Sequence, residues 1–207
     1  SYSGSLYVLH AGQIAILNPD SGGYDREDDI YDWGGPLPQN TRDMIALGSR
    51  LVVATDRGLV QLRGMALTEI RGEDGLPYED ALCLREGFGG DLWIGTTRGA
   101  VRNTGKEYHY FNADRWLPNE KVNDIAVDNN TAYIATDGGL GIISYEPYTL
   151  AKKAAYLERW LDEWGMKRLG FTHKLEWNSD GKEWVREVSD NDVGWSTHYL
   201  AAMCFKY

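Results

Sequence analysis

The sequence predicts a mainly β fold: a partial β-propeller of three to four blades, each of about 40 residues, followed by a small α-rich C-terminal segment with a hairpin or long loop. Three observations predict it. A strand-like motif recurs about every 40 residues, a Leu-Pro marker keeps the same phase, and the hydrophobic period changes after residue 147. We therefore expect the blades of an incomplete ring over residues 1–147 and a helix, a hairpin or loop, and a second helix over residues 148–207.

The recurring motif defines the repeat length. Leu51–Leu59 (LVVATDRGL) returns as Leu92–Ala100 (LWIGTTRGA) 41 residues later and as Ala132–Leu140 (AYIATDGGL) after a further 40 residues. A weaker copy, Leu6–Ile14 (LYVLHAGQI), lies 45 residues before the first clear copy. A Leu-Pro pair precedes each clear copy, with its prolines at Pro38, Pro77 and Pro118. Two markers that stay in phase over three copies indicate a true internal repeat.

Each copy reads as a set of short strands. In the last copy, Val122–Val127 alternates apolar and polar residues, as a half-buried strand does. Tyr133–Thr136 and Leu140–Tyr145 follow as further strands, separated by turns that contain Asn or Gly. In the copy before it, Glu107–Phe111 supplies an outer fourth strand. Four short antiparallel strands in each repeat make one propeller blade.

At Leu92–Gly99, together with the upstream Gly75–Pro77, the sequence resembles the repeat of two-component-regulator propellers. The resemblance covers residues 37–145 closely and residues 6–36 loosely, although the Trp and Gly of LWIGT are found only in this copy. Repeats of that family form propeller blades in bacterial sensor ectodomains and in secreted or cell-surface proteins. The resemblance therefore implies an extracellular, cell-surface or periplasmic protein.

At most four blades are visible, whereas propellers close with four to eight. An open ring exposes strand edges and apolar blade faces. We therefore expect further copies of the chain, or the remainder of the same protein, to complete the ring and the helical part. We also expect that this chain is not a stable monomer.

After residue 147, apolar residues recur at steps of three and four from Leu150 to Trp164, which predicts an amphipathic helix with Thr149 as its N-cap. A hairpin or ordered loop follows, in which Trp177 pairs across with Trp184. An apolar helix is expected to begin near residues 189–192. The stretch Asp190–Trp195 and the Ala-rich run after it are similar to the start of an (α/α) toroid, a fold of glycoside hydrolases and polysaccharide lyases.

Candidate site residues follow from these patterns. A carboxylate, Asp190 or Asp192, could act with His198 in acid/base catalysis on a sugar. The structural alternative is that the aspartate caps the helix and His198 packs against its neighbours. We expect some aromatic side chains to stack on sugar rings, and packing within the fold is their alternative role. These candidates are Trp116, Trp177, Trp184, Trp195 and Tyr199. Asn129 begins a glycosylation sequon.

Charge and composition exclude some classes of partner. The formal net charge of −10 repels phosphate backbones, so we expect no nucleic acid partner. No segment of the chain approaches the length of a transmembrane helix. No cofactor motif and no zinc-ligand spacing are present, and the acidic Asp20–Asp32 loop is a weak candidate for Ca²⁺. Cys83 and Cys204 lie in different predicted segments and imply no disulfide framework.

Two hypotheses for the function remain open. The chain is the propeller portion of an extracellular or periplasmic protein that binds glycans or proteins or serves as an assembly scaffold. Alternatively, it is a fragment of a carbohydrate-active enzyme, a polysaccharide lyase or glycoside hydrolase, in which a propeller is fused to an (α/α) toroid. The fold does not decide between them, because propellers host both functions.

Overall fold

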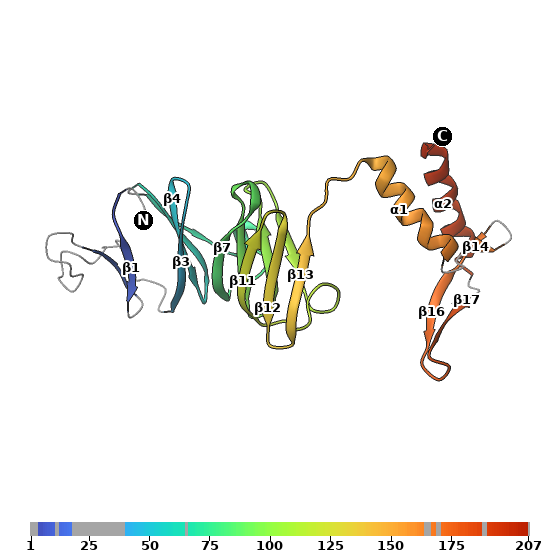
Figure 1. Cartoon of the computed structure of the whole chain (residues 1–207), viewed down its shortest axis with the longest axis horizontal. Coiled ribbons are helices and arrows are strands. Elements are labelled where there is room, and N and C mark those ends of the chain that lie inside the picture. Colours follow the sequence, from blue (N-terminus) through green and yellow to red (C-terminus); the bar gives the residue numbers. More distant parts are fainter. Residues whose placement is uncertain are drawn as a thin grey trace. The chain divides into compact units, whose positions relative to one another are not determined.

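The computed structural model describes residues 4–10, 13–17, 40–64, 66–163, 167–168, 171–187 and 190–206. Contacts divide the chain into two compact units, Ser1–Tyr145 and Glu146–Tyr207 (Figure 1). Each unit is described by itself. The Asp20–Asp32 loop, the candidate for Ca²⁺, lies outside the described residues.

The first unit is a row of antiparallel sheets in sequence order. A two-stranded sheet contains β1 (Tyr7–His10) and β2 (Gln13–Ile16). The next sheet has four strands, β3 (Thr41–Leu47), β4 (Arg50–Thr55), β5 (Gly58–Arg63) and β6 (Ala66–Ile70). The third also has four, β7 (Ala81–Glu86), β8 (Leu92–Thr96), β9 (Gly99–Asn103) and β10 (Tyr108–Phe111). The fourth has three, β11 (Val122–Asp128), β12 (Thr131–Thr136) and β13 (Gly139–Ser144).

These sheets confirm the prediction of a partial propeller with a repeat of about 40 residues. The first strand of each blade lies beside that of its neighbour, because β3 contacts β7 and β7 contacts β11. Two short 3-10 helices, Gly72–Asp74 and Phe88–Gly90, lie before β7 and between β7 and β8. The outer strand β10 confirms the fourth strand expected near residues 107–111.

The hydrophobic core lies between consecutive sheets. Val52 and Leu59 of one blade pack with Ile94 of the next blade, and all three side chains are buried. Trp93 lies on the opposite face of β8 and packs with residues of the β11–β13 sheet such as Ile134. Strand side chains alternate between the two faces, so each blade contributes to two cores. The LWIGT run is therefore buried throughout because both of its faces are covered.

The motif glycine has a local packing reason. Gly95 pairs with Cys83 across β8 and β7, and a Cβ at this glycine would collide with the Cys83 sulfur and lie 2.7 Å from Val122 Cγ1. The other blades carry Ala54 and Ala135 at the corresponding position. Glycine is needed in the middle blade because the space beside it is already filled.

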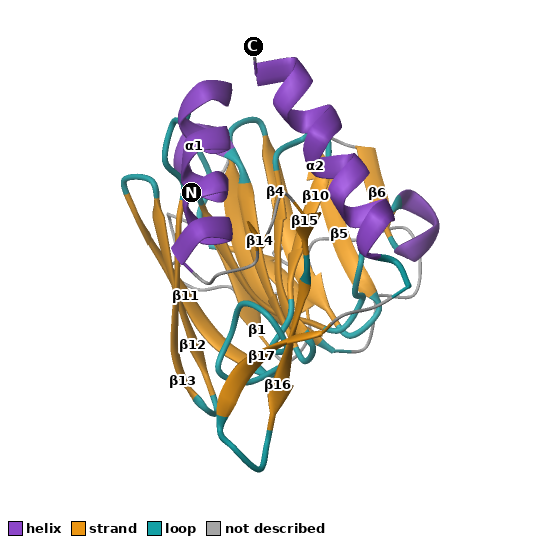
Figure 2. Cartoon of the chain, turned by 90° about the vertical axis from the view of Figure 1, so that its right-hand side faces the viewer, coloured by secondary structure: helices purple, strands orange, loops and turns teal. Residues whose placement is uncertain are grey.

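The second unit contains two helices and short strands (Figure 2). Its elements are α1 (Leu150–Glu163), β14 (Lys167–Arg168), β15 (Phe171–Thr172), β16 (Lys174–Asn178), β17 (Glu183–Glu187) and α2 (Asp192–Lys206). Thr149 caps α1 as predicted, since its Oγ1 accepts a hydrogen bond from the Lys152 amide at 3.2 Å. The hairpin is also confirmed: Trp177 faces Trp184, with ring centroids 5.3 Å apart.

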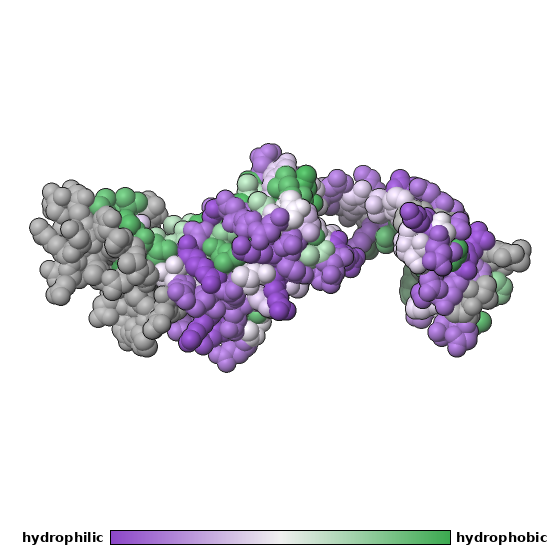
Figure 3. All heavy atoms as spheres, turned by 90° about the horizontal axis from the view of Figure 1, so that it is seen from below, coloured by the Kyte–Doolittle hydropathy of each residue, from purple (hydrophilic) through white to green (hydrophobic). Residues whose placement is uncertain are grey.

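In the view of Figure 3, hydrophilic side chains cover much of the described surface, with smaller apolar patches between them. Neither α1 nor α2 is long and apolar enough to cross a membrane, and no other described helix is. No group of three or more His, Cys, Asp or Glu side chains in the described part of the chain is placed to hold a metal ion.

Candidate ligand-binding sites

The first candidate site is the edge of the propeller where the first strand of each blade begins. At this edge Thr55 Oγ1 donates a hydrogen bond to the Gly58 carbonyl at 2.9 Å and accepts one from the Arg57 amide at 3.0 Å. Thr96 and Thr136 hold the corresponding turns of the next two blades through the same hydroxyl-to-carbonyl bond. The repeated Thr-x-x-Gly sequence therefore builds one turn three times. We call these turns, together with the connections that lead into β7 and β11, the rim.

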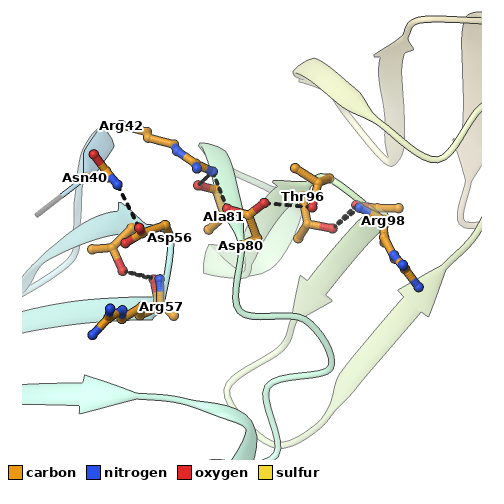
Figure 4. Close-up of polar contacts among 12 residues, drawn as sticks. Asn40, Arg42, Asp56, Arg57, Asp80, Ala81, Thr96 and Arg98 are labelled. Atoms are coloured by element: carbon orange, nitrogen blue, oxygen red, sulfur yellow. Dashed lines mark hydrogen bonds and ion pairs between the residues drawn. The ribbon is translucent and has the colours of Figure 1, made fainter. Parts of the chain in front are cut away.

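Ion pairs and hydrogen bonds occupy much of the rim (Figure 4). Asn40 donates to Asp56 at 2.7 Å, and Arg42 pairs with Asp80 at 2.5 Å. The Thr97 hydroxyl donates to the second oxygen of Asp80 at 2.9 Å. Asp56 is therefore engaged within its own blade, whereas Asp80 joins two neighbouring blades through Arg42 and Thr97.

The third blade continues the same pattern. Asn123 donates to Asp137 at 2.8 Å, and Lys121 lies 3.5 Å from the other oxygen of that carboxylate. The hydrogen bond from Asn123, followed by the charge of Lys121, lowers the pKa of Asp137 below its ordinary value. The carboxylate therefore keeps its charge under mildly acidic conditions.

Three arginines of the rim stand apart from these pairs. The Arg57 and Arg98 side chains extend from equivalent turns of adjacent blades (Figure 4). The guanidinium carbon of Arg98 lies 5.6 Å from the centroid of the Tyr78 ring. Arg115 lies over Trp116, with 5.0 Å from the guanidinium carbon to the ring centroid. Trp116 was one of the predicted sugar-stacking residues, and 46% of it is exposed.

The second candidate site is a pocket of about 480 Å³ in the second unit. Leu161 of α1 contributes one side, and Trp195 and Tyr199 of α2 contribute another. Residues that complete the lining are Thr172, His173 and Lys174. The lining is mainly apolar, with two aromatic side chains one helical turn apart.

A largely buried His–Asp pair places its histidine in the lining of this pocket. His173 Nδ1 is 3.0 Å from Asp192 Oδ2, and only 13% and 12% of the two side chains are exposed. Because a carboxylate oxygen accepts, Nδ1 carries the proton in this bond and Nε2 is left as the second polar atom of the ring. A second bond, from the Thr172 amide to Ser196 Oγ at 3.0 Å, holds β15 against α2. The strand and the helix together fix the orientation of the imidazole.

The structure brings together part of the predicted residue set. Trp195 and Tyr199 line the pocket, where Tyr199 also donates to Glu158 at 3.4 Å. Asp192 is not part of the lining and is linked to the pocket only through its contact with His173. His198 is exposed, with Nδ1 2.8 Å from the Gly194 carbonyl of its own helix.

The remaining predicted residues lie elsewhere. Asp190 is exposed before α2, and neither it nor His198 lines the pocket. Trp177 and Trp184 form the exposed hairpin pair. Asn129 is exposed in the turn between β11 and β12, where its amide donates to Asp128 at 3.1 Å. The predicted acid/base, ligand-binding and glycosylation roles of these residues stay predictions.

Sequence reasoning missed His173 as a partner of Asp192. The alternation in the run Phe171–Trp177 gives no signal for this role, because Thr172, His173 and Lys174 all line the pocket. The separation of 19 residues between His173 and Asp192 hid their contact. Only the docking of β15 on α2 brings them together.

No protein-family model and no curated protein matches the chain. Several solved structures are similar to the chain. The extracellular domain of a B. thetaiotaomicron protein named as a hybrid two-component system matches 92% of this chain with a TM-score of 0.58 and 16% identity. A second such extracellular domain from the same organism matches 88% of the chain with a TM-score of 0.53 and 18% identity. The chain spans only 26% and 23% of those two chains.

A catalytically inactive virginiamycin B lyase from Staphylococcus aureus, solved with quinupristin, is similar over 69% of this chain and 48% of its own, with a TM-score of 0.52 and 15% identity. At these identities the similarity concerns the fold alone. The similarity to these extracellular domains supports the propeller that the repeat predicted. The part of the prediction that concerns an (α/α) toroid has no such support.

Proposed function

We propose that the chain is a glycan-binding part of an extracellular or periplasmic protein and that the pocket of the second unit holds a sugar ring. One observation carries the proposal: Trp195 and Tyr199 line a pocket of about 480 Å³ beside the His173–Asp192 pair. The similarity in fold to extracellular sensor domains supports the proposed location.

The chemistry of the lining fits a pyranose. The C–H face of the ring stacks on an indole or phenol, whose faces are apolar and electron-rich. His173 Nε2 then offers a hydrogen bond to a ring hydroxyl, and Asp192 fixes the imidazole for that bond. Few polar groups line the pocket, so stacking supplies most of the affinity and the imidazole supplies the orientation.

Isothermal titration of the chain with a panel of oligosaccharides tests the proposal. Trp195→Ala is expected to weaken binding about tenfold or more, because a well-packed aromatic contact contributes ~1–3 kcal/mol. Phe205→Ala is the matched control, since it removes an exposed aromatic side chain of the same helix that lies outside the pocket. Absence of oligosaccharide binding, or equal loss in both variants, contradicts the proposal.

The His173–Asp192 pair favours a second candidate, a carbohydrate-active enzyme. A histidine oriented by a carboxylate at a pocket is an arrangement suited to proton transfer. Release of new chain ends from polysaccharides by the protein, lost in His173→Gln but kept in His198→Gln, supports this candidate. Oligosaccharide binding without any turnover supports the binding function instead.

A further inference from the structure

We propose that the sugar held by the pocket of the second unit is a neutral 6-deoxyhexose, whose methyl group packs on the apolar lining while two of its hydroxyls bind Thr172 and His173. The inference rests on the proposed function and names the class of sugar for the same pocket. Three properties of the lining carry it: a hydroxyl that lacks a partner, charged groups that are already matched, and an apolar remainder.

The hydroxyl of Thr172 is the first of these properties. Thr172 ends β15, lines the pocket and is only 7% exposed. Its Oγ1 atom is buried and has no hydrogen-bond partner among the residues that the structure describes. A buried hydroxyl without a partner is costly to the free protein. Its presence in the lining of a pocket therefore indicates that a polar group of the ligand completes the bond.

His173 supplies a second polar atom, on the residue that follows Thr172. Its Nδ1 lies 3.0 Å from Asp192 Oδ2, so in the neutral imidazole Nε2 is an acceptor. One ligand hydroxyl can donate to Nε2, and another can donate to Thr172 Oγ1 or accept from it. A sugar carries several hydroxyls on one rigid ring and satisfies both atoms, whereas a wholly apolar ligand leaves both unpaired.

The charged groups at the lining are matched within the protein, which favours a neutral sugar. Lys174 Nζ lies 2.8 Å from Glu187 Oε2 on the paired strand of the hairpin, and Asp192 is bound to His173. An acidic sugar would approach the Glu187 and Asp192 carboxylates, and an amino sugar would approach the Lys174 ammonium. Like charges brought together in this way weaken binding.

The remainder of the lining is mainly apolar and favours a methyl group on the sugar. Leu161 of α1 contributes one side of the pocket, and Trp195 and Tyr199 of α2 contribute another. The Tyr199 hydroxyl already donates to Glu158 at 3.4 Å. Against this surface the hydroxymethyl group of a hexose loses its bound water without gaining a partner. The methyl group of a 6-deoxyhexose is buried there favourably.

Isothermal titration of the whole chain with matched glycosides tests the class of sugar. The probes are the methyl α-glycosides of L-fucose and L-galactose and those of L-rhamnose and L-mannose, and the members of each pair differ by a single oxygen atom. We expect the 6-deoxy member of at least one pair to bind about tenfold more tightly than its counterpart, because the added hydroxyl is buried without a hydrogen bond.

Thr172→Val tests the hydroxyl, because it removes Oγ1 and keeps the branched shape of the side chain. We expect it to weaken binding of the preferred glycoside about tenfold. The unfolding temperature of the free chain is expected not to fall, since Oγ1 has no partner there to lose. Thr172→Ser keeps the hydroxyl and is expected to keep most of the affinity. Thr197→Val is the matched control, since this exposed hydroxyl donates to the Val193 carbonyl outside the pocket.

Several results overturn the inference. Equal or weaker binding of the 6-deoxy member in both pairs removes the role of the methyl group, and the proposed function still stands if Trp195→Ala weakens that binding. Unchanged binding in Thr172→Val, or equal loss in Thr197→Val, removes the role of the Thr172 hydroxyl. A lower unfolding temperature in Thr172→Val shows that the hydroxyl supports the fold instead. Failure of all four glycosides to bind also overturns the inference, and the oligosaccharide panel then decides separately whether the proposed function stands.

Discussion

Asp43 and Arg85 join the first strands of two neighbouring blades, with Asp43 Oδ2 accepting a hydrogen bond from Arg85 Nη1 at 2.8 Å. The same oxygen accepts a bond from the Leu84 amide at 2.8 Å. Arg85 continues to the following blade, where its Nη2 lies 2.5 Å from Asp124 Oδ1. One arginine therefore links β3, β7 and β11, and Asp43 holds the first strands of the first two blades together.

Asp43→Ala is expected to destabilise the protein by about 1–3 kcal/mol, because it leaves the partly buried Leu84 amide without its acceptor. Asp124→Ala is the matched comparison and is expected to cost no more than about 1 kcal/mol. Its side chain is 58% exposed and has the equivalent place two blades later. Urea denaturation followed by circular dichroism measures both. Equal losses would show that the hydrogen bond from the Leu84 amide to Asp43 contributes nothing to stability.

Cys83 is expected to resist thiol reagents at pH 8, whereas the exposed Cys204 reacts. Burial, followed by the charge of Asp124, raises the pKa of the Cys83 thiol to about 11, so very little thiolate forms at that pH. Ellman's reagent should therefore detect one thiol in the folded chain, two in denaturant, and none in folded Cys204→Ser. Rapid labelling of folded Cys204→Ser would contradict the burial.

The raised pKa of Cys83 also predicts how stability depends on pH. The thiol releases its proton more easily in the unfolded chain, where the pKa takes its ordinary value of 9.0. The stabilisation is thus fully present below pH 9 and is lost as the pH rises from 9 toward about 11. Cys83→Ala is expected to lose less stability than the wild type over this interval, as measured by urea denaturation at several pH values.

Gly95→Ala is expected to destabilise the protein by about 1–3 kcal/mol, because the new methyl collides with the Cys83 sulfur and crowds Val122. Combination with Cys83→Ala should recover part of the loss, since it removes the atom with the closest contact. Thermal denaturation of the single and double variants measures the coupling between the two sites. Additive losses would mean that the sulfur is not the atom that excludes a side chain.

The outer face of the β11–β13 sheet is expected to make the isolated chain self-associate. Leu140 is 57% exposed, whereas Leu59 and Ala100, its counterparts in the earlier blades, are 1% and 0% exposed under the blade that follows them. Leu140→Asp with Ile142→Asp is expected to reduce association without loss of stability, because both side chains are exposed.

Light scattering measures this association. Binding of a hydrophobic dye measures how much apolar surface is exposed. Leu67→Asp serves as the control, because Leu67 is an exposed residue on the outer strand β6. A compact wild-type monomer that binds no dye would rule out the expected association.

The repeat made the blades predictable from sequence. Strand pairing within a blade joins neighbouring segments of the chain, so the alternation in Val122–Asp128 and the turns that follow it contain most of the needed information. The same is true of the Thr149 cap and of the hairpin in which Trp177 faces Trp184. Each of these depends on residues that are close in the sequence.

Contacts between distant segments were not predictable in this way. The pairing of His173 with Asp192 depends on the docking of a strand on a helix, and the link from Arg85 to Asp43 spans 42 residues. The sequence by itself determined the repeat length, the strands and the turns, because local patterns encode backbone conformation. Only the tertiary structure decided which charges are neutralised and which remain available, because that balance depends on the distances between side chains of different blades.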